Sequence, residues 1–294
     1  MHIRRLVAIT AATGTLALGL AACGDATKEA PKSASTQGSA KPVEKKVSPV
    51  EAVRNATKAV EKQASAKVAV DSVDPADGNT KAEGTLSWKK GSEGAELSMD
   101  AGSDADMKDM AGPDGKVHMT MADGSVFLPV EGEMAEAAGG KKWLKLDGSS
   151  AEDNPAKDLP HGPAAALAAL STAADLAAAG EEQVAGAEAT HYTGTVDIKK
   201  LAADTSVLEL ITKDERDAYI EELHSTGLKN TVKIEAWISA DDLAVKTVES
   251  GKTAKGPAKL TIAYSGYGQT SAIKAPPAKD VTTFAEMIQN AAQG

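Results

Sequence analysis

The residue best placed to do chemistry is Cys23, the single cysteine of this 294-residue chain. It ends the tetrapeptide Leu20–Cys23, which follows two arginines and an apolar run from Leu6 to Leu20. A charged start, a short apolar middle and a small-residue cleavage site are typical of an export signal. Because a cysteine follows the expected cleavage site at Ala22, we expect its thiol to take a diacylglyceryl group and become the lipid-anchored first residue.

An uncleaved membrane anchor is the alternative interpretation of the same segment. The apolar run is shorter than the roughly 20 residues that a spanning helix needs. Thr10, Thr13 and Thr15 lower its hydrophobicity further. We therefore expect residues 1–22 to be a lipoprotein signal peptide, with the rest of the chain lipid-anchored at the outer face of the cytoplasmic membrane.

The cysteine count and the net charge argue against several classes of function. One cysteine permits no disulfide framework, no CxxC redox pair and no cysteine metal cluster. The formal net charge of -10 argues against a nucleic-acid partner and against attraction to anionic headgroups. The expected contact with the cell membrane is therefore covalent, through acyl groups on one residue.

Catalytic signatures are missing from the sequence. Ser265 lies between Tyr264 and Gly266 without the glycine pattern of a nucleophile elbow. His191 and His224 stand alone, apart from other candidate catalytic residues. We expect neither enzymatic activity nor a cofactor.

A methionine-rich stretch raises the question of copper, because thioethers together with imidazole favour Cu(I). Met107, Met110, His118, Met119 and Met121 fall within fifteen residues. On a strand, His118 would point to the face opposite to Met119 and Met121. We therefore expect no metal site here.

Two segments precede the first strand. Residues 23–47 are mostly Ala, Ser, Lys, Pro and Thr, a composition typical of a disordered tether. Order is expected to begin where Ser48, Pro49 and Glu51 form an N-terminal capping pattern. Apolar residues then recur at helical spacing, which predicts an amphipathic helix of about 15 residues.

Alternation of apolar and polar residues predicts six strands between Ala66 and Asp147 and five or six more between Gln183 and Ile273. Strict alternation favours an antiparallel sheet with one apolar face. A helical stretch interrupts the second group at Leu201–Gly227, with a capping box at Thr212, and a last helix is expected from Thr283.

An alanine-rich segment separates the two groups of strands. Pro163 is expected to begin a helix and Gly180 to end it. A helix that is apolar on most sides is buried. It is either a plain core helix or a plug that lies in the hollow of a curved sheet.

Several strand and turn patterns carry a resemblance to a known family. Gly186–Asp197, Ala236–Leu243 and Tyr264–Gly268, with Val126–Pro129 and Lys142–Leu146 before them, resemble the actinobacterial lipoproteins of the LppX and LprG type. The resemblance covers roughly residues 120–283. It implies an α+β fold like that of LolA and LolB: a strongly curved antiparallel half-barrel sheet of about 11–12 strands, with helices packed in and over its concave face. It also implies an apolar cavity for acylated lipids or glycolipids, in a single domain over residues 48–294.

Apolar positions of the expected strands and of the alanine-rich helix are predicted to line that cavity. They are Leu86, Leu97, Met119, Met121, Leu128, Leu167, Leu170, Leu176, Val232, Ile234 and Ile238. Methionine is unbranched and adaptable, which suits a surface that meets flexible chains.

The sequence thus predicts a membrane-anchored extracytoplasmic lipoprotein that binds an acylated lipid or glycolipid and carries it within the cell envelope. The alternative is an envelope sensor or interaction module that binds a partner protein through the same fold. In that case the helical stretch Asp204–Gly227, with Tyr219 and Glu222 exposed, would be the contact surface.

Overall fold

A computed structural model describes residues 47–75, 78–101, 108, 110–131, 134–146 and 162–291. They belong to one compact unit, Lys46–Gly294. The predicted signal peptide, its cleavage site at Ala22, the acylated Cys23 and all but the last residue of the tether lie outside the described residues.

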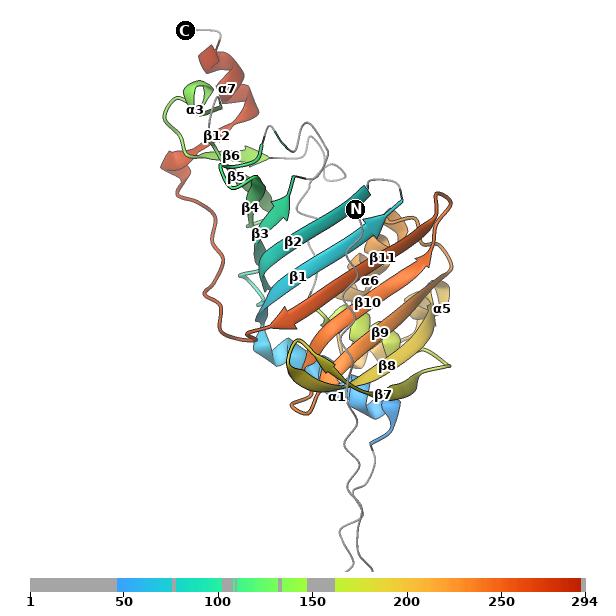
Figure 1. The fold of residues 1–294 in the computed structure, drawn as a ribbon. Coiled ribbons are helices and arrows are strands. Elements are labelled where there is room, and N and C mark those ends of the chain that lie inside the picture. Colours follow the sequence, from blue (N-terminus) through green and yellow to red (C-terminus); the bar gives the residue numbers. More distant parts are fainter. Residues whose placement is uncertain are drawn as a thin grey trace, which may run out of the picture. The chain divides into compact units, whose positions relative to one another are not determined.

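The central element is a twelve-stranded sheet (Figure 1). Its strands in chain order are β1 (Ser65–Asp74), β2 (Gly78–Ser87), β3 (Gly94–Asp100), β4 (Lys116–Ala122), β5 (Ser125–Pro129), β6 (Trp143–Leu146), β7 (Ala177–Val184), β8 (Ala187–Asp197), β9 (Thr231–Ser239), β10 (Ala244–Lys252), β11 (Pro257–Ser265) and β12 (Val281–Thr283). In space they follow the order β12-β6-β5-β4-β3-β2-β1-β11-β10-β9-β8-β7. Pairing of β1 with β11 therefore joins one meander, β1 to β6, to a second, β7 to β11.

The six strands predicted in the first half are confirmed as β1 to β6. The second half, where five or six were predicted, also has six, although β12 was not expected, and the sheet is not purely antiparallel. β12 pairs with β6 in parallel, with Val281 beside Trp143. The reason is the connection, because β12 is reached by a long loop after β11 and not by a hairpin. Ile273, which was expected in a strand, lies in this loop and is buried.

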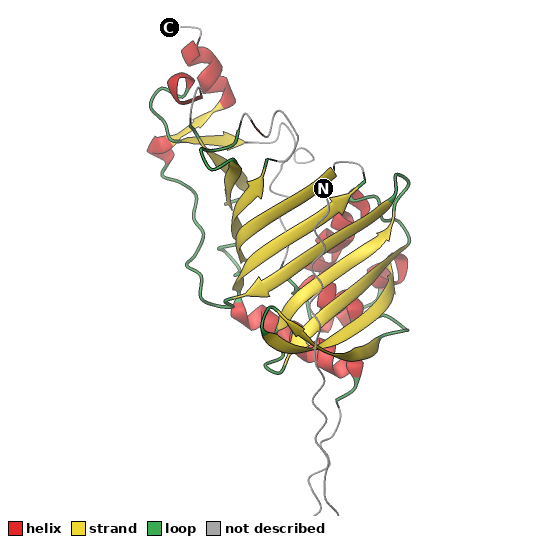
Figure 2. Ribbon diagram, in the orientation of Figure 1, coloured by secondary structure: helices red, strands yellow, loops and turns green. Residues whose placement is uncertain are grey.

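Helices cover one face of the sheet, and Figures 1 and 2 show α1, α5 and α6 on that side. The helical elements are α1 (Pro49–Gln63), α3 (Met134–Ala137), α4 (Ala164–Leu170), α5 (Ile198–Ala203), η2 (Ser206–Glu209), α6 (Lys213–Ser225), η3 (Ala278–Asp280) and α7 (Phe284–Ala291). In the part of the chain that the structure describes, none of them combines the length and apolar character that crossing a bilayer requires.

The first helix begins as predicted. Ser48 accepts a hydrogen bond from the Glu51 amide at 3.2 Å, which satisfies one of the free N–H groups of the first turn. Val53, Ala56 and Val60 of its apolar stripe are fully buried, whereas Val50 in the first turn is exposed. The helix lies against α4.

The strand register places apolar side chains on the helix-covered face. Ala66 lies opposite Leu86, and Val68 lies opposite Tyr264. Further along the sheet, Val232 on β9 lies opposite Val196 on β8. All six side chains are buried, so the alternation read from the sequence is the pattern of the actual core.

The predicted alanine-rich helix is wrong in length. α4 ends at Leu170, and the hydroxyl groups of Ser171 and Thr172 donate to carbonyls of the last turn. The alanines from Ala177 onward form β7 instead, paired with β8 at the end of the sheet. Alanine favours a helix by only a few tenths of a kcal/mol per residue, so a backbone ladder overrides it.

The shorter helix that does form, α4, is buried as expected. Every residue from Ala164 to Leu170 is buried, and the helix lies against α1, α6, β8 and β9. Gly194 on β8 permits this approach, because an added Cβ would lie 2.7 Å from the Cβ of Ala173.

Candidate functional site

A groove of about 890 Å³ opens beside the N-terminal end of α4. Its walls are the end of α1, the turn between β2 and β3, the start of α4, η2 and the first turns of α6. Its size falls within the range of roughly 300 to 1,000 Å³ that is typical of small-molecule sites.

One wall of the groove is apolar and fixed by Trp88. The indole Nε1 of Trp88 donates to the Val60 carbonyl oxygen at 3.2 Å, which ties the turn after β2 to α1. The chain at Gly162 passes directly over the indole, since an added Cβ there would lie 2.7 Å from its Cδ2 atom. Ala164 and Ala165 continue this wall.

Leucines and an isoleucine in and after η2 form another apolar part of the lining. Leu210 and Ile211 are buried, whereas Leu208 on η2 keeps 40% of its surface exposed at the groove. A large exposed leucine in a concave site is a surface that an apolar ligand would cover.

Charged residues surround these walls. Lys89 and Lys90 come from the turn after β2, and Glu209 and Glu215 from the opposite side. Glu209 is paired with Arg54 at 2.6 Å. Glu61, Glu93 and Asp214 also line the groove, so its lining combines apolar side chains with charged side chains of both signs, and acidic residues outnumber the lysines.

The predicted capping box at Thr212 is confirmed and shapes one edge of the groove. The Thr212 amide donates to Glu215 Oε2 at 2.6 Å, and the Glu215 amide donates to Thr212 Oγ1 at 3.2 Å. This exchange begins α6 at the groove.

Glu61 faces the groove from α1. Burial, followed by repulsion from Glu215, raises the pKa of the Glu61 carboxyl from 4.5 to about 7. A carboxyl with this pKa is partly protonated at neutral pH, which lowers the cost of placing a hydrocarbon chain beside it.

The eleven predicted cavity residues lie in two apolar clusters on the helix-covered face, and none is among the residues that line this groove. Residues buried around β2 to β5 are Leu86, Leu97, Met121 and Leu128, with Met119 packed against them. Residues of the cluster around α4 and β9 are Leu167, Leu170, Val232, Ile234 and Ile238, with Leu176 at its edge.

The residues that sequence reasoning missed are Trp88, Leu208, Leu210 and Ile211. Trp88 carried a weak signal, an aromatic residue at the end of a strand directly before two lysines and a glycine. The other three gave none, because they lie in and directly after η2, a short 3₁₀ turn without helical periodicity.

A polar pair lies beneath α6. Tyr219 donates a hydrogen bond to Glu249 Oε2 of β10 at 2.7 Å. Tyr219 is 3% exposed and Glu222 is half-buried, so the expectation that both are exposed on a contact surface is wrong. Burial raises the pKa of Glu249 from 4.5 to about 7 and raises that of Tyr219 above 10.

Two small cavities flank this pair, with volumes of about 10 and about 40 Å³. The nearby Tyr264 hydroxyl lies 3.3 Å from Thr247 Oγ1, so this region concentrates polar groups on an otherwise apolar face.

The opposite face of the sheet carries a stacked aromatic cluster. His191 lies parallel to the Trp237 ring, with centroids 4.1 Å apart, and its nitrogens are 3.3 Å from Glu182 and from Glu235. His191 therefore does not stand alone as predicted. Because Glu182 belongs to β7, the cluster ties that edge strand to β8 and β9.

His224, by contrast, lies at the end of α6. Its Nδ1 atom is 2.9 Å from the Leu228 carbonyl oxygen, a contact within the turn that ends the helix.

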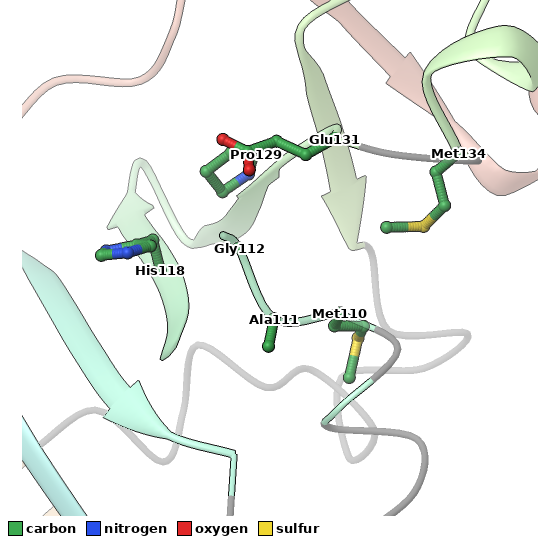
Figure 3. A pocket seen from close by; sticks show the side chains of 7 residues that line it. All are labelled: Met110, Ala111, Gly112, His118, Pro129, Glu131 and Met134. Carbon is green, nitrogen blue, oxygen red and sulfur yellow. The ribbon is translucent and has the colours of Figure 1, made fainter. Parts of the chain in front are cut away.

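A small pocket of about 20 Å³ lies near the methionine-rich stretch (Figure 3). Met110, His118 and Met134 line it, and Figure 3 shows His118 and Met134 on opposite sides. The imidazole Nε2 is 3.0 Å from Asp114 Oδ2.

The register of β4 confirms that His118 and Met119 point to opposite faces, since they lie opposite Ser98 and Leu97. Met107 lies outside the described residues.

The fold and the groove define an α+β protein with one large, mostly antiparallel sheet whose helices cover one face. No protein-family profile matches the chain. It is 31% identical over 218 residues to an uncharacterized 31.2 kDa protein of Streptomyces griseus, covering 71% of this chain and 70% of that protein. The chain therefore belongs to the same family as that Streptomyces protein.

A second relative is a protein of Streptomyces coelicolor described as a "putative lipoprotein", 26% identical over 73% of this chain and 67% of its own length. Among solved structures, the lipoprotein LppX of Mycobacterium tuberculosis matches 77% of this chain and 98% of its own, at 14% identity and a TM-score of 0.46. LppX is of the lipoprotein type that the strand and turn patterns of this sequence resemble.

Proposed function

We propose that this protein is an extracytoplasmic lipoprotein that binds an acylated lipid or glycolipid and carries it within the cell envelope. In this proposal residues 1–22 are removed, Cys23 is acylated at the outer face of the cytoplasmic membrane, and 23–47 tether a single domain, 48–294. The sheet is proposed to be a curved half-barrel of the LolA type.

The observation that carries the proposal is the groove beside α4. Its lining offers both apolar and charged side chains, which are the two kinds of surface that an amphiphile needs. Each buried methylene contributes about 0.8 kcal/mol, so ten methylenes contribute about 8 kcal/mol before ordering costs. The description of the Streptomyces coelicolor relative as a lipoprotein supports the proposed anchor.

Native purification tests the ligand directly. Protein isolated from an actinobacterial host is extracted with organic solvent, and the extract is examined by mass spectrometry. We expect near one acylated lipid per chain. Empty protein that retains one envelope protein partner instead would favour the sensor interpretation.

A point variant tests the place of binding. Leu208→Asp puts a charge into the apolar wall, and we expect it to weaken binding of a fluorescent fatty acid at least tenfold, because a carboxylate must then be desolvated. Ile288→Asp on α7 is the matched control, since Ile288 is 68% exposed and does not line the groove. Equal binding by both variants would contradict the site.

The eleven residues predicted to line a cavity remain a prediction. They identify two apolar clusters against which a longer hydrocarbon chain is proposed to lie once it extends beyond the groove.

A further inference from the structure

Exposed apolar side chains lie at the start of α1. In the part of the chain that the structure describes, the large apolar side chains that are exposed are Val47, Val50, Val73, Leu208, Phe284 and Ile288. Val47 directly precedes the cap of α1, and Val50 lies in its first turn, with exposed fractions of 53% and 42%. Scattered single apolar side chains are ordinary on a protein surface, whereas neighbouring ones indicate a contact surface.

An ion pair brings Leu208 to the same side of the domain. Arg54 follows Val50 by four residues and therefore lies one turn further along the same side of α1. Its Nη2 atom is 2.6 Å from Glu209 Oε2, and Leu208 directly precedes Glu209 in η2. The first turns of α1 and η2 thus form one surface, defined by Val47, Val50 and Leu208, which we call the α1–η2 surface.

The α1–η2 surface continues into the groove. Leu208 belongs to both, because it lines the groove and keeps 40% of its surface exposed. Glu209 lines the groove as well, and its carboxylate is paired with Arg54. A contact made by the α1–η2 surface therefore also brings the groove next to the contacted partner.

The chain enters the folded domain at this surface. In the proposed function the anchor is Cys23, and residues 24–46 separate it from Val47. A flexible coil of about 23 residues has a root-mean-square reach of about 25 to 30 Å, so the bilayer lies within reach of Val47. Tethering gives such a contact a high effective concentration, and a small apolar surface then suffices.

We propose that the α1–η2 surface docks on the lipid bilayer and holds the groove next to it. The inference rests on the proposed function, because it uses the anchor at Cys23. The valine and leucine side chains leave water for the boundary between headgroups and acyl chains. The contact does not depend on anionic lipids, because the net charge of -10 disfavours them.

Docking lets a lipid pass from the bilayer to the groove without crossing bulk water. Uptake from a membrane then depends on Val47 and Val50, although neither residue lines the groove. Binding of a ligand that is already in solution does not depend on them. This difference separates a docking surface from a part of the binding site.

Hydrogen exchange read by mass spectrometry locates the contact. The mature chain, Cys23 to Gly294, is coupled through its single thiol to a maleimide lipid in phosphatidylcholine vesicles, and the reference is the same chain capped with N-ethylmaleimide in solution. We expect the amides of the first turn of α1 and of η2 to exchange about threefold more slowly on the vesicle. Those around Val73 and in α7 should not change, and high salt should not remove the effect.

A double variant tests the side chains. Val47→Asp combined with Val50→Asp puts two carboxylates into the contact, while α1 still forms because negative charge is favourable near a helix N-terminus. We expect the slower exchange to disappear. The initial rate at which NBD-labelled phosphatidylethanolamine is taken up from vesicles should fall about fivefold, because the carboxylates must be desolvated on docking.

Two controls accompany this variant. Its affinity for cis-parinaric acid in solution should equal that of the wild type, which also shows that the domain is folded. Phe284→Asp combined with Ile288→Asp changes two apolar side chains of α7 that are 53% and 68% exposed, and it should leave exchange and uptake unchanged.

The outcomes separate the two proposals. If the wild type takes up lipid but exchange at α1 and η2 is not slowed, or is slowed only at α7, the docking surface is refuted while lipid binding stands. Equal uptake rates for the wild type and the valine variant would also refute it. If the wild type binds neither probe, the proposed function fails, and hydrogen exchange still decides whether the surface docks.

Discussion

Glu249 brings a carboxyl group onto the helix-covered face of the sheet, beneath α6. Its pKa is raised from 4.5 to about 7, mainly by burial. The folded protein therefore holds a proton at pH 5 to 7 that the unfolded chain has already released. The contribution of this protonated carboxyl to the free energy of unfolding is present in full at acid pH. It is lost as the pH rises through about 7.

Substitution of Glu249 by glutamine keeps the acceptor for Tyr219 and removes the titration. We expect Glu249→Gln to match the wild type near pH 5 and to be more stable by up to about 3 kcal/mol at pH 8, because each pKa unit is worth about 1.4 kcal/mol. Urea unfolding at pH 5, 6, 7 and 8 measures the difference.

Glu61 supplies the comparison, since burial and Glu215 raise its pKa to about 7 as well. Glu61→Gln should remove a smaller share of the same pH dependence, because that side chain is only half-buried. Parallel pH profiles for the wild type and Glu249→Gln would contradict the account.

The inward position of Glu249 could not be predicted from the sequence. The register of β10 shifts between Ala244 and Lys246. This bulge turns Thr247 and Glu249 toward the helices and leaves Val248 beside Trp237 on the other face. A one-residue slip exchanges the two faces of a strand, and no residue type in the segment announces it.

At the scale of elements, the contact between α4 and β8 depends on a glycine. An added Cβ at Gly194 would lie 2.7 Å from the Cβ of Ala173 and 3.0 Å from Leu170 Cδ1. We expect Gly194→Ala to lower the free energy of unfolding by about 1 to 3 kcal/mol through overpacking. Thermal or urea unfolding measures the loss.

A double variant shows whether that contact is the cause. Ala173→Gly removes the atom with which the new Cβ would collide, so Gly194→Ala should cost less in its presence. Additive losses in the double variant would place the strain elsewhere.

Elements with strong local signals were predictable. The capping residues Ser48 and Thr212 located α1 and α6, and alternation located most of the strands, although β12 was not expected. The first part of β7 was missed because Ala177–Gly180 favours a helix by composition, whereas in the structure it extends the hairpin with β8. The groove was missed for a related reason, since its walls come from five separated elements whose meeting has no local pattern.

At the scale of the whole molecule, the proposed attachment through Cys23 can be tested by substitution. We expect Cys23→Ala to prevent acylation, so that the protein is released into the medium or stays unprocessed. Fractionation of cells and medium, with mass measurement of the N-terminus, measures this outcome. Membrane retention of a correctly cleaved variant would contradict the proposed anchor.

The architecture was predictable further than the site because it follows from a repeated pattern. Alternation over many strands specifies an apolar face, and a few helices suffice to cover one side. The order of the strands in the sheet could not be predicted from this pattern, because β12 and β6 pair although no turn connects them.

Synthesis from the N-terminus gives the ladder between β1 and β11 a particular timing. β2 follows β1 directly in the chain, so these strands can pair early. Lys67 on β1 can pair with Ser265 on β11 only after most of the chain has been synthesised. Until β11 is synthesised, the backbone amides and carbonyls along one edge of β1 have no partner strand. Another extended segment can then pair with that edge. The nascent chain is therefore exposed to wrong strand pairing for most of its synthesis. The two meanders pair with each other only near the end of translation.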